Sequence, residues 1–164
     1  MSKRLNLREF QQKLIDRLQE HEMTATRVTT LGVQVAGRNW LVDMADISEV
    51  LPLPRLTAVP LTKPWYRGVT NVRGNLYSVV DMAAYEYSAT ATGVVGNRIL
   101  LVGAKFTFNA ALLVDRVLGL RDARAWQKTA ADGRVEYRDE QGASWHKLDV
   151  IELLAQTEFL HIGI

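Results

Sequence analysis

The sequence predicts a mainly β protein, either one small all-β barrel or a pair of barrels, with an amphipathic helix before it and a short helix near its end. Three observations lead to this prediction. Apolar and polar residues alternate with a period of two from residue 27 onward, the apolar runs are short and closely spaced, and turns rich in Gly or Pro separate them. With 164 residues, 48% of them hydrophobic and 23% charged, the chain has the length of one ordinary domain and the composition of a soluble globular protein.

The first pattern in the chain, over residues 7–20, has helical spacing. Its apolar residues recur at steps of three and four, with one more alongside: Leu7, Phe10, Leu14, Leu18 and Ile15. Charged and amide residues occupy the other face, so we expect an amphipathic helix of about four turns. The favoured interpretation is that it packs on its own domain. Docking on another protein is the main alternative, and a polar face of mixed charge disfavours a membrane-surface helix. We expect residues 1–26 to form this helix and its link, and residues 27–164 to form the β domain.

Two β-hairpins and a further strand pair are expected next. Residues 27–44 alternate on both sides of a polar turn, which is typical of a hairpin. A second hairpin is predicted over residues 68–81, where Arg73, Gly74 and Asn75 make a tight reversal. The third pair is expected at residues 98–102 and 107–114.

The remaining segments contain breaks and short helical turns. Four prolines between residues 52 and 64 exclude a helix there and leave short extended pieces. Asp81 is placed to cap a helical turn at residues 82–85. The small and polar residues of 84–97 predict the most mobile loop of the chain. A short helix is expected at residues 149–156, with Asp149 as its N-cap.

Catalytic and metal chemistry lacks candidate residues in this sequence. The chain has no Cys, which excludes disulfides, thiol nucleophiles and Cys-ligated metals. The acidic residues Asp43, Asp46 and Glu49 do not have the spacing of a calcium loop, so we expect them to be solvated or paired with Arg. No catalytic constellation, metal site or cofactor is predicted. The three histidines lie far apart: His21, His146 and His161.

Binding of single-stranded nucleic acid is the alternative function considered. Small β-barrels can bind single strands through basic grooves and stacking aromatic residues. Here Trp40 follows Arg38 closely, and Trp65 and Tyr66 precede Arg67. A net charge of only +2 and nearby acidic residues argue against this class.

The most distinctive segment, residues 64–82, reads PWYRGVTNVRGNLYSVVDM. It resembles the CheW-like chemotaxis adaptor family, in which a Gly-Val-x-Asn-x-Arg-Gly turn precedes a strand that ends in Val-Asp-Leu or a similar sequence. Further matches keep the family's order, and together they cover about residues 28–162: residues 46–50, 111–120 and 145–154. The family often has Pro where this chain has Ser78, a change that we expect the strand to tolerate. The first helix and residues 159–164 are most similar to adaptors of type IV pilus (twitching motility) systems.

This resemblance implies a fold and a function. The fold would be two SH3-like barrels of about five strands each, sharing an apolar core. Such proteins are adaptors without an active site. They bridge the regulatory domain of a CheA-type histidine kinase and the cytoplasmic tip of a methyl-accepting chemoreceptor, in chemotactic or twitching motility. We therefore expect a cytoplasmic protein associated with receptor arrays, with no membrane insertion and no nucleic-acid partner.

The resemblance also supplies candidate partner-binding residues. Arg73 matches the family's turn arginine and Glu49 its acidic partner, so we expect an ion pair that presents Arg73 to the receptor; a purely structural pair is the alternative. The apolar surface around the pair would include Ile47, Val50 and residues 68–72, beginning at Gly68. Of these, Val69 fits a core position better.

Two further sets of residues are expected to contact partners. Trp65 and Tyr66 lie just before Gly68, where large aromatic residues commonly act as interface anchors. For the kinase, we expect strand edges within residues 31–42, with Trp40 as a candidate, although a core position suits Trp40 equally well.

Overall fold

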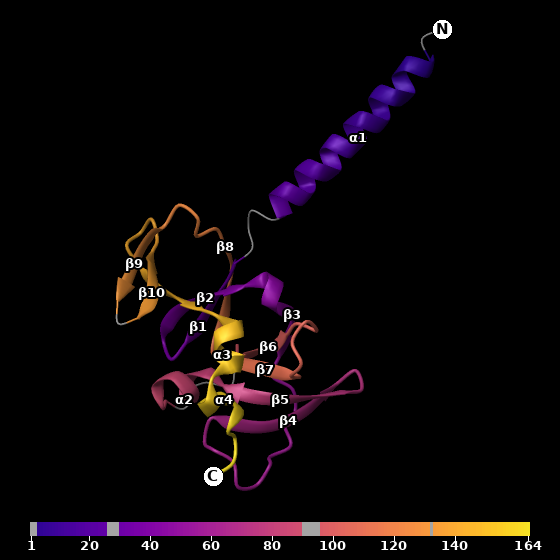
Figure 1. Ribbon diagram of the computed structural model, residues 1–164. Coiled ribbons are helices and arrows are strands. Elements are labelled where there is room, and N and C mark those ends of the chain that lie inside the picture. Colours follow the sequence, from indigo (N-terminus) through magenta and orange to yellow (C-terminus); the bar gives the residue numbers. More distant parts are fainter. Residues whose placement is uncertain (1–2, 26–29, 90–95, 132) are drawn as a thin grey trace.

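Two β-sheets form the body of the protein, and a long N-terminal helix, α1 (Lys3–Ala25), extends away from them (Figure 1). The computed structural model describes residues 3–25, 30–89, 96–131 and 133–164, and within α1 it describes the side chains of residues 7–19. The mainly β prediction is confirmed, with six strands in one sheet and five in the other. Hydrogen bonds between the described strands do not close either sheet into a complete barrel.

The six-stranded sheet has the strand order β8-β1-β2-β11-β10-β9. Its centre is the predicted first hairpin, in which β1 and β2 pair antiparallel around a two-residue turn. β8 pairs antiparallel with the other edge of β1, and β11 pairs parallel with the other edge of β2. The strands of this sheet are β1 (Thr30–Val35), β2 (Arg38–Asp43), β8 (Arg116–Arg121), β9 (Gln127–Ala131), β10 (Arg134–Arg138) and β11 (Ser144–Leu148).

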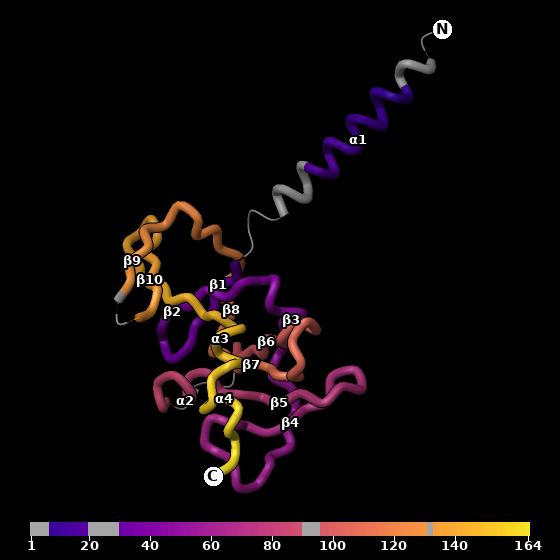
Figure 2. The backbone as a smooth tube through the Cα atoms, viewed as in Figure 1, coloured from indigo at the N-terminus to yellow at the C-terminus, as the bar shows by residue number. Residues whose placement is uncertain are grey.

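The five-stranded sheet has the order β3-β6-β7-β5-β4, so β3 and β4 are its two edges. The predicted hairpin of residues 68–81 is present as β4 and β5, and the predicted strand pair as β6 and β7. Figure 2 shows the β4–β5 and β9–β10 hairpins on opposite sides of the body formed by the two sheets. The strands are β3 (Ile47–Pro52), β4 (Tyr66–Val72), β5 (Asn75–Asp81), β6 (Arg98–Val102) and β7 (Ala110–Val114), and the 3-10 turn η1 (Met44–Asp46) leads into β3.

The core has two parts, because the central strands of the five-stranded sheet are buried on both faces. Alternate residues of β6 belong to different clusters: Leu100 and Val102 lie in the larger cluster, and Ile99 and Leu101 in the smaller one. The larger cluster also contains Val33 and other side chains of the six-stranded sheet, so it fills the space between the sheets. Burial on both faces explains why β6 and β7 are continuous apolar runs rather than alternating ones.

Short helices cover the larger cluster. The side chain of Asp81 accepts a hydrogen bond from the backbone N–H of Ala84 and caps α2 (Met82–Tyr87), as the sequence predicts. Asp149 accepts in the same way from Glu152 and caps α3 (Val150–Ala155). α4 (Thr157–Leu160), which the sequence reading did not include, buries Phe159 in the same cluster.

Three expectations are corrected by the fold. Residues 82–87 are helical, so the loop expected at 84–97 begins only after Tyr87; residues 90–95 of that prediction lie outside the described part of the chain. Neither β1 nor β2 is a sheet edge, because β8 and β11 flank them, so residues 31–42 cannot offer the open edge expected for kinase contact. The favoured packing of the first helix on its own domain is wrong, because its five apolar side chains are 47–65% exposed.

Candidate partner-binding site

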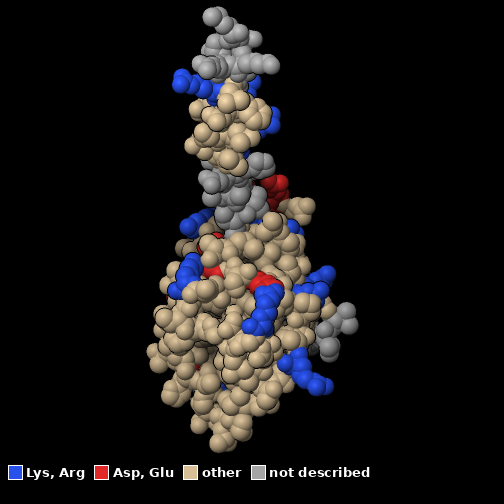
Figure 3. Space-filling model, turned by 90° about the vertical axis from the view of Figure 1, so that its right-hand side faces the viewer, with Lys and Arg blue, Asp and Glu red and all other residues tan. Residues whose placement is uncertain are grey.

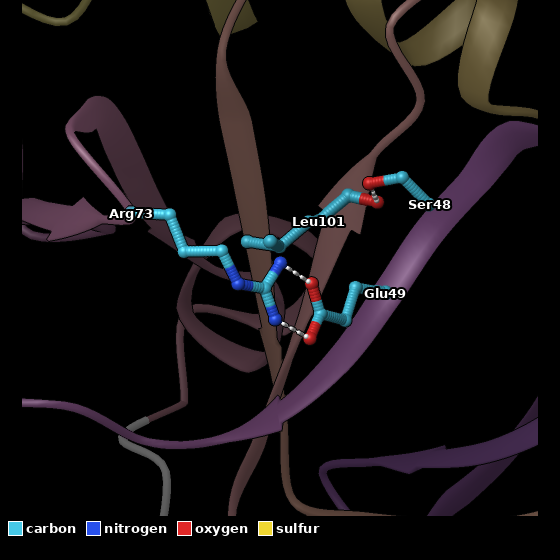
Figure 4. Close-up of polar contacts among 4 residues, drawn as sticks. All are labelled: Ser48, Glu49, Arg73 and Leu101. Carbon is cyan, nitrogen blue, oxygen red and sulfur yellow. Dashed lines mark hydrogen bonds and ion pairs between the residues drawn. The ribbon is translucent and has the colours of Figure 1, made fainter.

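Glu49 and Arg73 form a two-pronged ion pair across the five-stranded sheet (Figure 4). Nη1 of Arg73 donates to Oε2 of Glu49, and Nη2 donates to Oε1, each over 2.5 Å. Glu49 comes from edge strand β3 and Arg73 from the turn between β4 and β5. The pair therefore joins the two opposite edges of the sheet, and two parallel bonds of this kind fix the orientation of the guanidinium group.

The position of Arg73 follows from the geometry of the β4–β5 turn. Val72 pairs with Asn75, which leaves Arg73 and Gly74 as the two turn residues, both with positive φ (51° and 86°). Such two-residue turns match the twist of the flanking strands. The side chain of Asn71 accepts a hydrogen bond of 2.9 Å from the N–H of Gly74, which holds the turn.

A β-bulge sets the direction of Glu49. In the pairing of β3 with β6, Ile47 lies opposite Val102 and Glu49 lies opposite Leu101, so Ser48 is the extra residue. Ile47 and Val50 pack with the larger core cluster, whereas Leu51 packs with the smaller one. Without the bulge, Glu49 would share a face with Ile47; with it, Glu49 shares the face of Leu51. The hydroxyl of Ser48 donates to the carbonyl oxygen of Leu101 over 3.3 Å, which holds the bulge in place (Figure 4).

Gly68 allows the loop after β3 to lie against β4. Thr57 exchanges two backbone hydrogen bonds with Val69, of 2.8 and 2.9 Å. A Cβ on Gly68 would lie only 2.2 Å from the carbonyl oxygen of Thr57, and the φ of Gly68 is +126°. Glycine is therefore required here both for its conformation and for the space. The close backbone approach expected from the sequence is confirmed.

The ion pair perturbs both of its members. The hydrogen bonds from Arg73 are the main reason that the pKa of Glu49 is lowered, and the same bonds raise the pKa of Arg73. Both groups are thus charged throughout the physiological pH range. The Arg73 side chain is 71% exposed and that of Glu49 29%. Arg73 is therefore accessible to a partner while Glu49 holds its orientation.

The residues expected to surround the pair divide between core and surface. Ile47 is buried in the larger core cluster, which corrects its placement in a contact surface. Val50 and Val69 are half-buried and pack against the same cluster, so the expectation that Val69 serves the core is confirmed. Of the candidate partner-binding residues Ile47, Glu49, Val50, Gly68 and Arg73, Arg73 is the exposed one.

Trp65 and Tyr66 are not exposed anchors, as the sequence had suggested. Trp65 is stacked on Phe159, with ring centroids 6.1 Å apart, and is buried. Tyr66 is also buried, and its hydroxyl lies 2.8 Å from that of Ser78. Trp40 is buried as well, with its indole N–H donating to the hydroxyl of Tyr87 over 3.0 Å. All three aromatic residues stabilise the fold instead of forming an open contact surface.

An apolar groove near the hairpin was missed by the sequence analysis. It has a volume of about 390 Å³ and lies between β5, the segment before β7 and the C-terminal residues. Leu76 (58% exposed), Phe108 and Leu160 line it. The one local signal was an apolar residue at position 76, directly after the polar turn that contains Arg73. Phe108 and Leu160 could not be assigned to the groove without the tertiary structure.

Elsewhere in the described part of the chain, charged side chains form ion pairs rather than a metal site or a nucleic-acid groove. Asp43 pairs with Lys147 over 2.5 Å and Asp46 with Lys105 over 2.6 Å. Within the described ranges, no three His, Cys, Asp or Glu side chains could together hold a metal ion. Figure 3 shows Lys and Arg scattered over one face rather than gathered in a single patch. Because the aromatic residues proposed for base stacking are buried, the nucleic-acid alternative loses its stacking surface.

No described helix combines the length and the apolar character needed to span a membrane.

Three comparisons with known proteins show what this chain is similar to. A family model described as the CheW-like domain matches residues 29–157. Protein PilI of Pseudomonas aeruginosa is 34% identical over 91 residues, which are 56% of this chain and 51% of that protein, so the chain spans about half the length of this relative. The crystal structure of the scaffolding protein TtCheW from Thermoanaerobacter tengcongensis matches with a TM-score of 0.62 and 19% identity, over 76% of this chain and 90% of that chain. At this identity the likeness establishes the fold.

Proposed function

This chain belongs to the CheW-like domain family, and on that premise we propose that it is a non-catalytic adaptor that couples methyl-accepting chemoreceptors to a CheA-type histidine kinase. Its partners would be the cytoplasmic tip of the receptor and the regulatory domain of the kinase. The likeness to PilI supports a place in type IV pilus (twitching motility) signalling, with flagellar chemotaxis as the other setting. In this role the protein is cytoplasmic and joins receptor arrays through protein contacts.

The observation that carries this proposal is the exposed Arg73 held by Glu49. An arginine has five N–H donors in a fixed fork, and Glu49 accepts from only two of them. The remaining donors are available to carboxylate or carbonyl groups of a partner. A guanidinium group already fixed in direction loses less entropy on binding than a free side chain would. We assign Arg73 to the receptor.

Charge reversal at the pair tests this assignment. Binding of the receptor tip is titrated for the wild type, Arg73→Glu, Glu49→Arg and the double variant. The melting temperature of each protein is also measured. Arg73→Glu places like charge against Glu49 and against an acidic partner, so its affinity should fall about tenfold or more. Arg124→Glu is the matched control, because Arg124 is similarly exposed and also pairs with one carboxylate, that of Asp122.

The double variant distinguishes a direct contact between Arg73 and the receptor from a purely structural role of the ion pair. If Arg73 touches the receptor, the double variant should recover the melting temperature of the wild type but not its affinity. Recovery of affinity would mean that the ion pair only stabilises the β4–β5 hairpin, which would contradict a direct contact between Arg73 and the receptor. Unchanged affinity in Arg73→Glu with a normal melting curve would remove this site from the proposal altogether.

A further inference from the structure

Helix α1 carries an apolar stripe that is open to solvent. On a helix with about 3.6 residues per turn, Leu7, Phe10, Leu14 and Leu18 fall within a stripe roughly 80° wide, and Ile15 borders it. These side chains are 47–65% exposed, and the helix extends away from both sheets (Figure 1). A stripe of this size on a solvent-exposed helix is typical of a docking surface.

The charges along α1 are divided between its two halves. The first half is net positive: Lys3, Arg4, Arg8 and Lys13 stand against Glu9. The second half is net negative: Asp16, Glu20 and Glu22 stand against Arg17. The helix also has no acidic residue in its first turn and no basic residue in its last.

This distribution is unfavourable for the helix alone. The N-terminal end of a helix carries partial positive charge and the C-terminal end partial negative charge, so basic residues at the start and acidic residues at the end oppose its dipole. A second helix of the same sequence that runs antiparallel to the first offsets this unfavourable placement of charges. Its acidic end then lies beside the basic end of the first helix, and the two helix dipoles also attract each other.

We propose that α1 pairs antiparallel with α1 of a second copy of this chain, with the two apolar stripes facing each other. The stripe runs from Leu7 to Leu18, over about 16 Å, and its centre nearly coincides with the centre of the helix. An antiparallel pair therefore superimposes the two stripes and at the same time places opposite charges side by side. A parallel pair would also superimpose the stripes but would bring like charges together at both ends.

Such pairing would connect two CheW-like domains through their N-terminal helices. It does not depend on the adaptor function proposed above, because it rests only on the stripe and the charges of α1. Its symmetry is that of a two-fold dimer, in which each substitution enters the interface twice.

The oligomeric state tests the pairing. Sedimentation equilibrium over a concentration series is measured for the full chain, for Leu14→Glu and for Gln12→Glu. Both substitutions add one negative charge to the helix, but Gln12 lies on the polar face, between Arg8 and Asp16 at four residues on either side. The full chain and Gln12→Glu should dimerise equally well. Leu14→Glu should weaken the dimer about tenfold or more, because two buried leucines are replaced by charges.

Crosslinking tests the direction of the helices. The chain has no Cys, so single Cys substitutions at Leu7 and Leu18 give unambiguous products. These two positions are the ends of the apolar stripe and lie equally far from its centre, so Leu7 of one helix meets Leu18 of the other in an antiparallel pair and Leu7 in a parallel pair. In a mixture of Leu7→Cys and Leu18→Cys chains, an antiparallel pair should give mainly the mixed disulfide. Dominant like-with-like disulfides would indicate a parallel pair and overturn the proposal.

Three other results would also contradict it. A full chain that stays monomeric up to millimolar concentration would show that the stripe does not pair with a second copy of this chain. A dimer that persists in Leu14→Glu would have its interface elsewhere. A monomeric chain that sediments with phosphatidylglycerol vesicles through the same stripe would make a lipid surface its partner.

Discussion

Substitution of Gly68 by Ala tests whether the loop after β3 must contact β4. The added Cβ would lie 2.2 Å from the carbonyl oxygen of Thr57, at a φ of +126°. Backbone strain at such a φ costs about 1–3 kcal/mol, and a methyl group forced into filled space costs about 1–3 kcal/mol more. Gly68→Ala should therefore lower the free energy of unfolding by about 2–6 kcal/mol, against a typical total of about 5–15 kcal/mol.

Gly74→Ala is the matched control for this substitution. Gly74 also has a positive φ (+86°), but a Cβ there would meet nothing within 4 Å. Its loss should be the conformational cost alone, about 1–2 kcal/mol. Urea unfolding followed by tryptophan fluorescence gives both values by linear extrapolation. Equal losses for the two variants would refute the close approach, and a normal stability of Gly68→Ala with lost partner binding would make Gly68 a contact residue.

Four further results are expected. Deletion of residues 1–23 should leave a folded domain, because the described apolar side chains of α1 are exposed; an insoluble or unfolded product would place α1 in the core. Limited proteolysis should cut first within residues 88–97, which are small and polar in sequence, and a first cut within 68–81 would contradict the pairing of β4 with β5. Asp149→Ala should cost about 1 kcal/mol and Asp149→Asn much less, because only the second keeps an acceptor for the N–H of Glu152. Arg73 lowers the pKa of Glu49, so the ion pair should contribute fully to thermal stability at pH values above the pKa of an unfolded Glu. This contribution should be lost as the pH falls through the lowered pKa of Glu49, and a Glu49→Gln variant should lack this pH dependence.

The parts of the fold that could be predicted are those fixed by local chemistry. The hairpin around Arg73 and Gly74 follows from a turn sequence between two apolar runs. The caps at Asp81 and Asp149 follow from a short polar side chain just before a helical pattern. In each of these cases the deciding contacts lie within a few residues of one another.

The parts that were missed depend on contacts between distant segments. The segment from β8 to β10 is rich in Arg and other charged residues, and it forms strands because β1 and β11 pair with it. Trp65 is buried because Phe159, from the end of the chain, stacks on it. β2 loses its open edge only through parallel pairing with β11. Local sequence patterns contain no information about pairings of this separation.

The candidate site was partly accessible from the sequence. The resemblance pointed to Glu49 and Arg73, and the structure shows the two side chains bonded. The bulge at Ser48, which turns Glu49 away from the main core, depends on the pairing of β3 with β6 and has no clear local sequence pattern. The groove beside Leu76 likewise needs the C-terminal segment to be in place.

Cosedimentation of three components tests the adaptor role most directly. Vesicles that carry receptor cytoplasmic tips are mixed with a CheA-type kinase, with or without this chain, and the pelleted kinase is measured. The kinase should sediment with the receptor vesicles when the wild-type chain is present, and much less when Arg73→Glu replaces it. A chain that leaves kinase sedimentation unchanged while binding single-stranded oligonucleotides at physiological salt would contradict the adaptor role.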